Sequence, residues 1–435
     1  MKTLLAGVKR LELQPKIGTD LVGYSQIQKT LGIHDPICVR ALVLDNEETT
    51  IALCSIEVCF FLSSNVDQMR LLISERCAIL PENIFFFATH THAAPAFFEP
   101  ENWLISPLQT VADAVVEAYE NRQSAKIGMG YGQLQGYSIN RRFMNRPVDP
   151  SISVIRIDTA DGKPLSLLGN YGNHAVVMGY DNSYVSGDWP GYSSRRLEAD
   201  FGDGFVALFG QGGAGDVNPL TETVRQKLAA GHPVEAIGST STMYGHYDKN
   251  TQHSWNIGDR VGTTFIEAET IAIAYNKEVM RVWRSIEATQ NSDLWAVTVT
   301  IDAAPAPDEP PIPDTPEINH LRQRFKQRSV SFDDPIEFDV MVIGIGDAVL
   351  VGHPGETFSE NSIALRKLCQ QMGITHPVLI TYANGWNTYL TPENAYAEGG
   401  YEVTAAQGFG LSRNIQDRIL TDILPHLKAK APRSN

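Results

Sequence analysis

The chain has too few basic residues for a typical nucleic-acid-binding protein. Its 435 residues include 35 Lys and Arg against 50 Asp and Glu, which gives a formal net charge of −15 at pH 7. Binding to nucleic acid or to an anionic membrane surface depends on basic patches, so this balance argues against both partners. The remaining composition, with 43% hydrophobic residues, is that of a globular protein with an ample core.

Long apolar runs are also missing. No run approaches the length that is needed to span a bilayer. Residues 1–10 have too short an apolar core for a secretion signal. We therefore expect a protein without a membrane anchor.

Cysteine is scarce, and its pattern is not that of a disulfide framework. The five cysteines form no CxxC spacing, and their number is odd. Most of them lie in apolar surroundings, which predicts reduced core thiols and a cytoplasmic protein. They are Cys38, Cys54, Cys59, Cys77 and Cys369.

The sequence shows no internal repeat or low-complexity tract. Short β-rich runs alternate with amphipathic helical segments, which predicts an α/β fold in which mixed β-sheets pack with helices. We expect a single compact catalytic domain over residues 1–435. The clearest elements are a hairpin at 41–56, strands at 84–89, 153–158, 164–171 and 205–209, two strands around Gly346 and Asp347, and helices after Ser106-Pro107, at 266–275 and at 415–424.

Two segments interrupt this pattern. One is a polar insertion at 221–256, and the other is a proline-rich connector at 303–316. Regular elements resume on both sides of the connector, so we interpret it as a surface loop rather than a domain linker. Both segments are candidates for shaping the mouth of a pocket.

The most informative stretch is an apolar run, 84–88, that ends in Thr89-His90-Thr91-His92. Alternate side chains of a strand share a face, so the imidazoles of His90 and His92 would project together from the strand end. This arrangement is typical of metal ligands on a rigid element. Two hydrogen-bonded histidines at a strand terminus are the alternative.

A catalytic zinc normally takes three protein ligands and a water, so further ligands should follow other strands. His174 follows the strand at 167–171, and Glu356 follows a strand and a Pro-Gly turn. The alternatives are a hydrogen-bonded core histidine and a carboxylate favoured by a helix N-terminus. Together with His90 they form a His/His/Glu set, which suits Zn²⁺ as a Lewis acid.

Other stretches could contribute to a site. The glycine-rich loop at 209–219 could cradle an oxyanion or be a plain turn, and it lacks the dinucleotide fingerprint. The stretch at 382–402 is dense in aromatic and amide groups, as in a pocket wall or a packed loop. Arg141 and Arg142 are usually surface charges, but in a pocket either could hold a carboxylate or carbonyl oxygen, and the pair hints at an acidic group on the substrate.

In this order, these stretches resemble the catalytic domain of the neutral (non-lysosomal) ceramidases, which are zinc-dependent amidases. The likeness runs from residues 6–8 and 32–36 to the segment at 389–401. It implies zinc ligation by the side chains that match the Thr-His-Thr-His, second histidine, Pro-Gly-Glu and Tyr-x-Thr motifs of the family. These are His90, His174, Glu356 and Tyr389.

The resemblance also implies catalytic roles. His92 would lie against the reacting carbonyl, and Arg141 and Tyr401 would line the site. The departures are as informative, because Asn218 replaces the family's active-site serine and Ala93-Ala94 replaces Ser-Gly. Asn218 can donate a hydrogen bond but cannot be a nucleophile. We expect no counterpart of the family's C-terminal immunoglobulin-like domain.

We therefore expect a zinc-dependent hydrolase that cleaves the C–N bond of a soluble small-molecule amide with a metal-activated water. An esterase or lactonase is the first alternative, because the same chemistry attacks esters more easily. A non-catalytic protein with a structural metal is the second. A two-metal phosphatase fits poorly, since its Asp-rich ligand pattern is missing. The sequence gives no prediction of oligomeric state.

Overall fold

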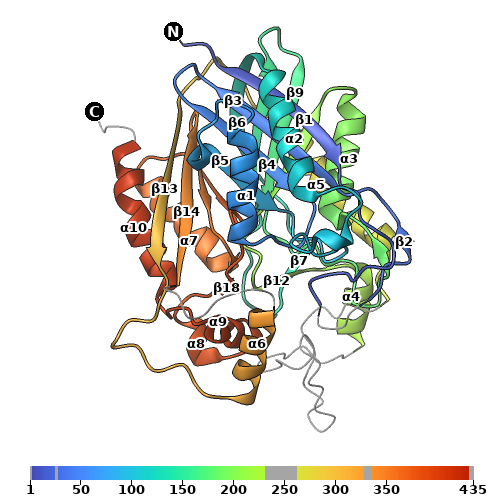
Figure 1. Ribbon diagram of the computed structural model, residues 1–435, viewed down its shortest axis with the longest axis vertical. Coiled ribbons are helices and arrows are strands. Elements are labelled where there is room, and N and C mark those ends of the chain that lie inside the picture. Colours follow the sequence, from blue (N-terminus) through green and yellow to red (C-terminus); the bar gives the residue numbers. More distant parts are fainter. Residues whose placement is uncertain (1, 25–27, 231–261, 328–335, 431–435) are drawn as a thin grey trace.

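The computed structural model describes residues 2–24, 28–230, 262–327 and 336–430. Three blocks of the chain share one topology: three antiparallel strands, then a helix, a fourth strand parallel to the third, and a closing helix (Figure 1). The first block consists of β1 (Leu5–Glu12), β3 (Cys38–Asp45), β4 (Thr50–Ile56), α1 (Ser63–Ser74), β5 (Ile84–Ala88) and α2 (Pro107–Glu120).

The second and third blocks repeat this order with the same pairings. The second consists of β6 (Gln123–Gln133), β8 (Ser151–Thr159), β9 (Pro164–Tyr171), α3 (Asp188–Phe201), β11 (Val206–Gln211) and α5 (Phe265–Ser285). The third consists of β13 (Leu294–Asp302), β14 (Glu337–Ile345), β15 (Ala348–Gly352), α7 (Ser359–Gln371), β17 (His376–Ile380) and α10 (Ile415–Lys430).

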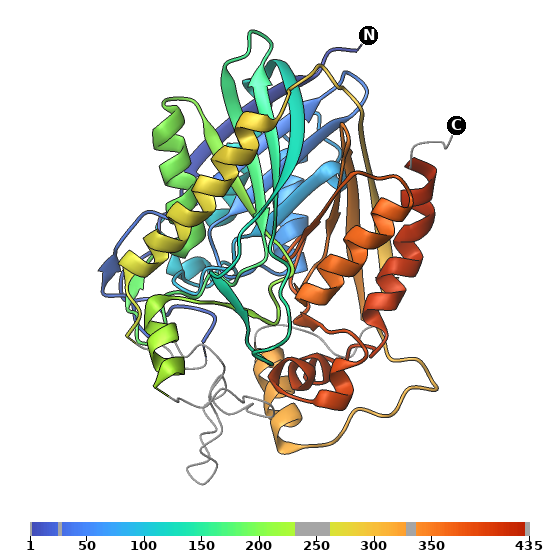
Figure 2. The same cartoon turned by 180° about the vertical axis from the view of Figure 1, so that it is seen from behind.

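The first two blocks form one eight-stranded sheet, because β1 pairs with β6 at Leu5 and Ala6, whereas the third forms a separate four-stranded sheet. Alternation along each strand divides its side chains between two cores. On β3, Leu42 and Leu44 face an inner core that all three blocks share, while Val43 packs against α1 and α2. In the same way, α3 with α5 and α7 with α10 cover the other blocks (Figure 2).

The shorter elements gather where the parallel strands end, the edge at which α/β proteins usually bind ligands. They are β2 (Gly32–Ile33), β7 (Ser138–Asn140), β10 (Tyr184–Val185), β12 (Val217–Pro219), β16 (Glu356–Thr357), β18 (Tyr389–Leu390), α4 (Glu222–Ala229), α6 (Pro316–Gln327), α8 (Ala395–Glu398), α9 (Tyr401–Phe409) and the 3₁₀ turn Pro100–Asn102. The 3₁₀ turn Pro81–Asn83 lies at the opposite edge, directly before β5.

The structure confirms the α/β class, with mixed sheets packed against helices. The predicted hairpin is β3 and β4, and the predicted helix after Ser106 is α2. The helix expected at 266–275 continues to Ser285, because its apolar stripe extends through Val279 and Val282. Residues 231–256 of the polar insertion lie outside the described residues, and the connector at 303–316 is a loop that leads to α6.

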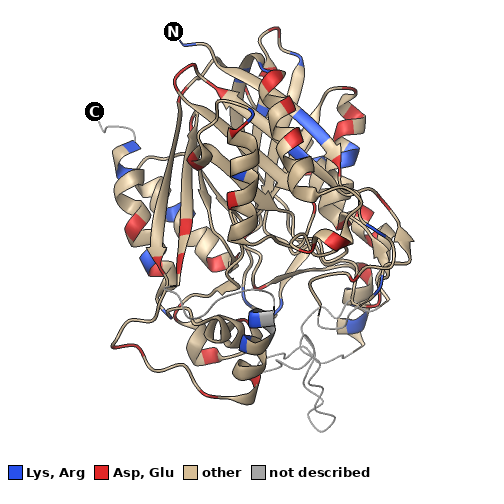
Figure 3. Cartoon of the chain, in the orientation of Figure 1, with Lys and Arg blue, Asp and Glu red and all other residues tan. Residues whose placement is uncertain are grey.

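The structure contains a repeat of topology that the sequence does not show. Topology recurs three times although no sequence repeat is visible, because each block packs against different neighbours and equivalent positions carry different side chains. All five cysteines are free, and only Cys77 is partly exposed. Of the described helices, none has the length and apolarity to cross a bilayer. Acidic and basic residues are interspersed over the described helices in Figure 3.

Candidate metal centre

Three buried side chains, one from each block, converge where the parallel strands end. His90 follows β5, His174 follows β9, and Glu356 follows β15. The Nε2 atoms of the two histidines lie 3.2 Å apart. Glu356 Oε2 is 3.7 Å from His90 Nε2 and 3.3 Å from His174 Nε2.

The hydrogen bonds of the histidines set the protonation of the converging atoms. His90 Nδ1 lies 2.8 Å from the carbonyl oxygen of Cys59, and His174 Nδ1 lies 2.6 Å from that of Ala214. A carbonyl oxygen only accepts, so each Nδ1–H donates and each Nε2 presents a lone pair. Burial lowers the pKa of His90 to about 3 despite the opposing effect of Glu356, so the ring is neutral at pH 7.

Three acceptor atoms that face one another would be stabilised by a cation between them. A tetrahedral zinc with bonds of about 2.0–2.1 Å separates its ligand atoms by about 3.3–3.4 Å. The observed separations of 3.2, 3.3 and 3.7 Å among His90, His174 and Glu356 agree with this spacing. The ligand atoms of these three residues lie close enough together to hold a metal ion. Neutral imidazole and carboxylate are ligands that zinc takes, so the residues fit the ion.

Tyr389 lies beside this group, because β18 pairs in parallel with β16 and places Tyr389 opposite Glu356. Its hydroxyl oxygen accepts a hydrogen bond of 3.0 Å from Arg141 Nη2. Burial raises the pKa of Tyr389 well above its ordinary value, and Arg141 opposes this rise. The role of Tyr389 as a fourth ligand stays a prediction.

Arg141 sits among groups that keep its guanidinium charged. Its Nε donates to Glu402 Oε1 at 2.8 Å, and the ring of Tyr401 lies 5.3 Å from that of Tyr389. Burial works against the charge, but Tyr389 and Glu402 raise the pKa of Arg141 well above its ordinary value. Arg141, Tyr389 and Tyr401 thus form one wall of the site.

The expectation that Arg141 and Arg142 hold an acidic group of the substrate loses its basis. Arg142 Nη1 donates to Glu402 Oε2 at 2.7 Å, and Arg142 Nη2 donates to Glu398 Oε2 at 3.1 Å. Both guanidinium groups therefore already pair with carboxylates of the chain. This pairing links α8 and α9 to the site.

His92 approaches the same centre, with its Nε2 3.0 Å from His90 Nε2. The ring of Tyr24 meets the His92 ring edge-on at 4.8 Å. Gly23 lies directly against this ring at a φ of 123°, and a Cβ there would stand 2.3 Å from the imidazole. Glycine is therefore needed for the chain to cover His92.

Two amides of the glycine-rich loop at 209–219, for which an oxyanion cradle and a plain turn were both open, donate hydrogen bonds within the chain. Gly212 N donates to the carbonyl oxygen of Tyr171, and Gly215 N donates to that of Thr357. A Cβ at Gly215 would lie 2.7 Å from the Glu356 carbonyl oxygen, so the glycine allows close backbone packing between two blocks. The loop also orients His174, because the carbonyl oxygen of Ala214 accepts a hydrogen bond from His174 Nδ1. Asn218 is fully buried on β12.

Two residues that sequence reasoning did not single out hold Glu356. Tyr382 donates its hydroxyl proton to Glu356 Oε2 at 3.3 Å and stacks on the His90 ring at 3.9 Å. Trp386 Nε1 donates to Glu356 Oε1 at 3.2 Å. Both lie in the aromatic stretch at 382–402, which was the available signal. No feature of the sequence indicated that the carbonyl group of Cys59 would orient His90.

The backbone around the centre is strained. His90, Tyr382, Asn384 and Thr388 are not glycines, yet their φ angles are 68°, 55°, 53° and 55°. Such conformations cost on the order of 1–3 kcal/mol each and persist where the surrounding structure enforces them. They cluster at functional sites in proteins, which supports a functional role for this region.

Comparisons with known proteins show similarity to the neutral ceramidases. Residues 14–269 match the family described as neutral/alkaline non-lysosomal ceramidase, N-terminal. The chain is 30% identical to neutral ceramidase A of Dictyostelium discoideum over 48% of this chain and 34% of the relative. It is 24% identical to neutral ceramidase of Pseudomonas aeruginosa over 88% of this chain and 66% of the relative.

The solved structure of neutral ceramidase from Pseudomonas aeruginosa has the same fold. It superposes with a TM-score of 0.75 at 19% identity, covering 100% of this chain and 76% of that chain. A structure described as ceramidase complexed with C2 gives a TM-score of 0.73 at 18% identity, covering 100% of this chain and 77% of that chain. The chain spans between one third and two thirds of the length of the two sequence relatives.

Proposed function

The chain belongs to the neutral/alkaline non-lysosomal ceramidase family, and from this premise we propose that it is a zinc-dependent hydrolase of an amide bond. The observation that carries the proposal is the convergence of two imidazole lone pairs and one carboxylate oxygen within 3.7 Å. His90, His174 and Glu356 would hold the ion, with Tyr389 as the fourth protein ligand.

When bound, zinc would supply a Lewis acid and activate a water for attack on the amide carbonyl. The chain's own residues would supply the remaining steps. Arg141 carries a positive charge beside the hydroxyl of Tyr389, so it can stabilise negative charge on the carbonyl oxygen. His92 has an imidazole nitrogen next to the centre and is suited to deliver a proton to the leaving nitrogen.

Surrounding contacts would keep these groups in place. The Cys59 and Ala214 carbonyls orient the two imidazoles, as the partners of metal-bound histidines generally do. Tyr382 and Trp386 each hold one oxygen of Glu356. The side chains of His90, His174 and Glu356 are at most 4% exposed, which excludes bulk water and strengthens electrostatic interactions.

The proposed substrate is an amide of a small, soluble molecule rather than ceramide. The support is in the departures from the family pattern, where Ala93 and Ala94 follow His92 and where a buried Asn218 replaces serine. Asn218 offers an amide where the family offers a hydroxyl, so the polar contacts to a substrate would differ there.

Metal analysis and a matched substrate panel test the proposal. We expect one zinc per purified chain, loss of hydrolysis on chelation, and recovery with added zinc. The panel pairs a short-chain ceramide with a soluble N-acyl amide and the matched ester. A preference for ceramide would overturn the substrate but not the reaction. Cleavage of the ester alone would indicate an esterase, and zinc binding without any hydrolysis would indicate a binding protein.

A further inference from the structure

The ring of His92 is covered by a short stretch of chain that precedes β2. The ring of Tyr24 meets the His92 ring edge-on, with centroids 4.8 Å apart and planes inclined at 67°. Gly23 lies over the same imidazole, where a Cβ would find no room, so the chain can pass this close to His92 only with glycine there. Edge-to-face contacts between aromatic rings depend on orientation, so Tyr24 can fix the rotation of the imidazole.

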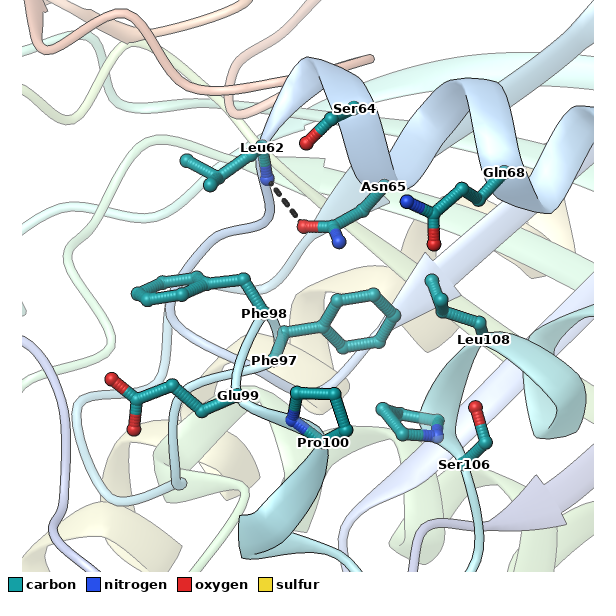
Figure 4. A pocket seen from close by; sticks show the side chains of 11 residues that line it. Leu62, Ser64, Asn65, Gln68, Phe97, Phe98, Glu99, Pro100, Ser106 and Leu108 are labelled. Carbon is teal, nitrogen blue, oxygen red and sulfur yellow. Dashed lines mark hydrogen bonds between the residues drawn. The ribbon is translucent and has the colours of Figure 1, made fainter. Parts of the chain in front are cut away.

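Backbone pairing fixes the path of this stretch over His92. The Val22 N–H donates a hydrogen bond of 3.0 Å to the carbonyl oxygen of Ala94, in the segment that has just left His92. Further along the same segment, Phe97 and Phe98 border a cavity beside α1 and α2 (Figure 4). His92 is not among the residues that line this cavity. The cavity therefore takes no part in holding His92.

The hydroxyl of Tyr24 is anchored to another loop of the centre. It donates a hydrogen bond of 2.8 Å to the carbonyl oxygen of Met178, which lies in the loop that follows His174. In the same loop, the carbonyl oxygen of Ala175 accepts a hydrogen bond of 3.3 Å from the His92 N–H. The loop therefore holds both the tyrosine, by its hydroxyl, and the histidine, by its backbone.

A fully buried carboxylate holds this loop. Asp188 Oδ2 accepts a hydrogen bond of 3.0 Å from the Met178 N–H, and Asp188 Oδ1 accepts one of 2.6 Å from the Trp189 N–H. Burial raises the pKa of Asp188 to about 6 although these N–H groups oppose the rise, so the carboxylate is mainly charged at pH 7. The φ of Asp188 is 52°, a strained value for a residue other than glycine. Met178 is thus held through its N–H by Asp188 and through its carbonyl oxygen by Tyr24.

Tyr24, Met178 and Asp188 together form a brace behind His92. We propose that Tyr24 is a positioning residue for proton transfer by His92, and that Asp188 anchors Tyr24 through Met178. This inference rests on the proposed hydrolysis of an amide. It assigns the brace to one chemical step, the departure of the leaving nitrogen.

The leaving nitrogen is the atom for which this positioning matters. When the C–N bond breaks, the nitrogen keeps the electron pair of the bond and needs a proton, because the anion of an alkylamine is a poor leaving group. The attacking water loses one proton, and a ring nitrogen of His92 can pass it to the leaving nitrogen, so the protons balance. A para-nitrophenolate leaves without a proton. Loss of positioning at His92 should therefore slow cleavage of an amide but not of a para-nitrophenyl ester.

Kinetics of the zinc-loaded chain with an N-alkyl amide and the para-nitrophenyl ester of the same acid test the proposal. Tyr24→Phe keeps the ring but removes the hydroxyl that anchors it. We expect kcat for the amide to fall by at least about tenfold and kcat for the ester to change by less than about twofold. Tyr131→Phe is the matched control, because the Tyr131 hydroxyl also donates to a distant carbonyl oxygen, that of Pro377, and both rates should stay unchanged.

Two further variants sharpen the kinetic test. Asp188→Asn keeps the size of the side chain but turns an N–H donor toward one of two backbone N–H groups, so it should show the same selective loss. In a His92→Gln background, Tyr24→Phe should cost no further activity, because the imidazole that it positions is gone. Equal losses for the amide and the ester, or an additional loss in the His92→Gln background, would overturn the proposal.

A measurement without substrate separates this inference from the proposed function. With isotope-labelled histidine rings, His92→Gln identifies the magnetic resonance signals of His92. Tyr24→Phe should shift or broaden these signals, whereas Tyr131→Phe should not. Unchanged His92 signals in a Tyr24→Phe chain that cleaves the amide would overturn the positioning role alone. A wild-type chain that binds zinc but cleaves neither substrate would overturn the proposed function, and with it the catalytic role of Tyr24, even where the signals shift.

Discussion

Two buried polar clusters differ in whether their charged and polar groups have partners within the chain. In the ion network of Arg40, Glu57 and Glu198, a buried guanidinium on β3 pairs with carboxylates from the end of β4 and from α3. In the candidate metal centre, His90, His174 and Glu356 turn acceptor atoms toward one another. The carboxylates of the network have arginine partners within the chain, whereas the centre is suited to a cation from outside the chain.

The two clusters differ in their backbone as well. The residues of the ion network have ordinary φ angles, whereas His90 and Tyr382 adopt left-handed conformations. They are nevertheless linked, because Glu57 belongs to the network and Cys59, which follows closely, supplies the carbonyl that orients His90. The contrast teaches how to interpret buried polar groups. Where each charged group has a partner of opposite charge, the cluster has a structural role. Where several hydrogen-bond acceptors face one another, the cluster indicates a functional site.

Removing the carboxylate of the centre should have the largest effect. Glu356→Gln keeps the shape of the side chain but removes its charge, so zinc should be lost. We expect kcat/KM for the amide substrate to fall by at least about 10³-fold, since Lewis-acid catalysis disappears. Metal content per chain and steady-state kinetics measure this. Full zinc occupancy with unchanged hydrolysis would show that Glu356 is not a metal ligand, so the centre would no longer differ from the ion network in its need for an ion.

Breaking the ion network should lower the stability of the fold and leave zinc binding intact. Arg40→Met removes the guanidinium that lies between the buried carboxylates of Glu57 and Glu198 and leaves them only the more peripheral Arg195 and Arg10, so the free energy of unfolding should fall by about 3–5 kcal/mol. The folded fraction should still bind one zinc. Denaturant unfolding and metal analysis measure the two quantities. Loss of zinc at unchanged stability would show that the network belongs to the metal site.

A single hydroxyl sharpens the comparison. Tyr382→Phe keeps the ring that stacks on His90 and removes the hydrogen bond to Glu356. Zinc affinity should fall by about 10- to 100-fold, as for other groups that orient a metal ligand. Tyr275→Phe is the control, because the buried Tyr275 hydroxyl has no hydrogen-bond partner among the described residues. Competition with a chelator measures both affinities, and equal losses would contradict the role of Tyr382.

The smallest effect concerns acid stability. Burial opposes ionisation of Glu198, but Arg40 prevails and lowers the Glu198 pKa below its ordinary value of 4.5. The folded state thus binds fewer protons than the unfolded state, so this stabilisation is present above pH 4.5 and is lost as the pH falls through the folded pKa. Glu198→Gln should flatten the loss of stability below pH 4.5, measured by unfolding at several pH values. The exposed Glu48→Gln control should keep the original slope.

Much of the centre could be predicted because its side chains follow apolar strands. His90, His174 and Glu356 each stand just beyond a strand of recognisable composition, and parallel strands bring their ends together. The carbonyls of Cys59 and Ala214 could not be predicted, since every residue has a carbonyl group. The pairing of Arg142 with Glu402 and Glu398 also depends on the long-range arrangement of helices, which local patterns do not encode.

The origin of the ligands in three separate blocks constrains how the protein is made. A ribosome releases His90 with the first block and His174 with the second, but Glu356 emerges only with the third. The growing chain therefore lacks the complete ligand set until the third block has been made. Capture of the proposed ion would then follow synthesis of the third block, and its binding energy would contribute to docking this block onto the other two.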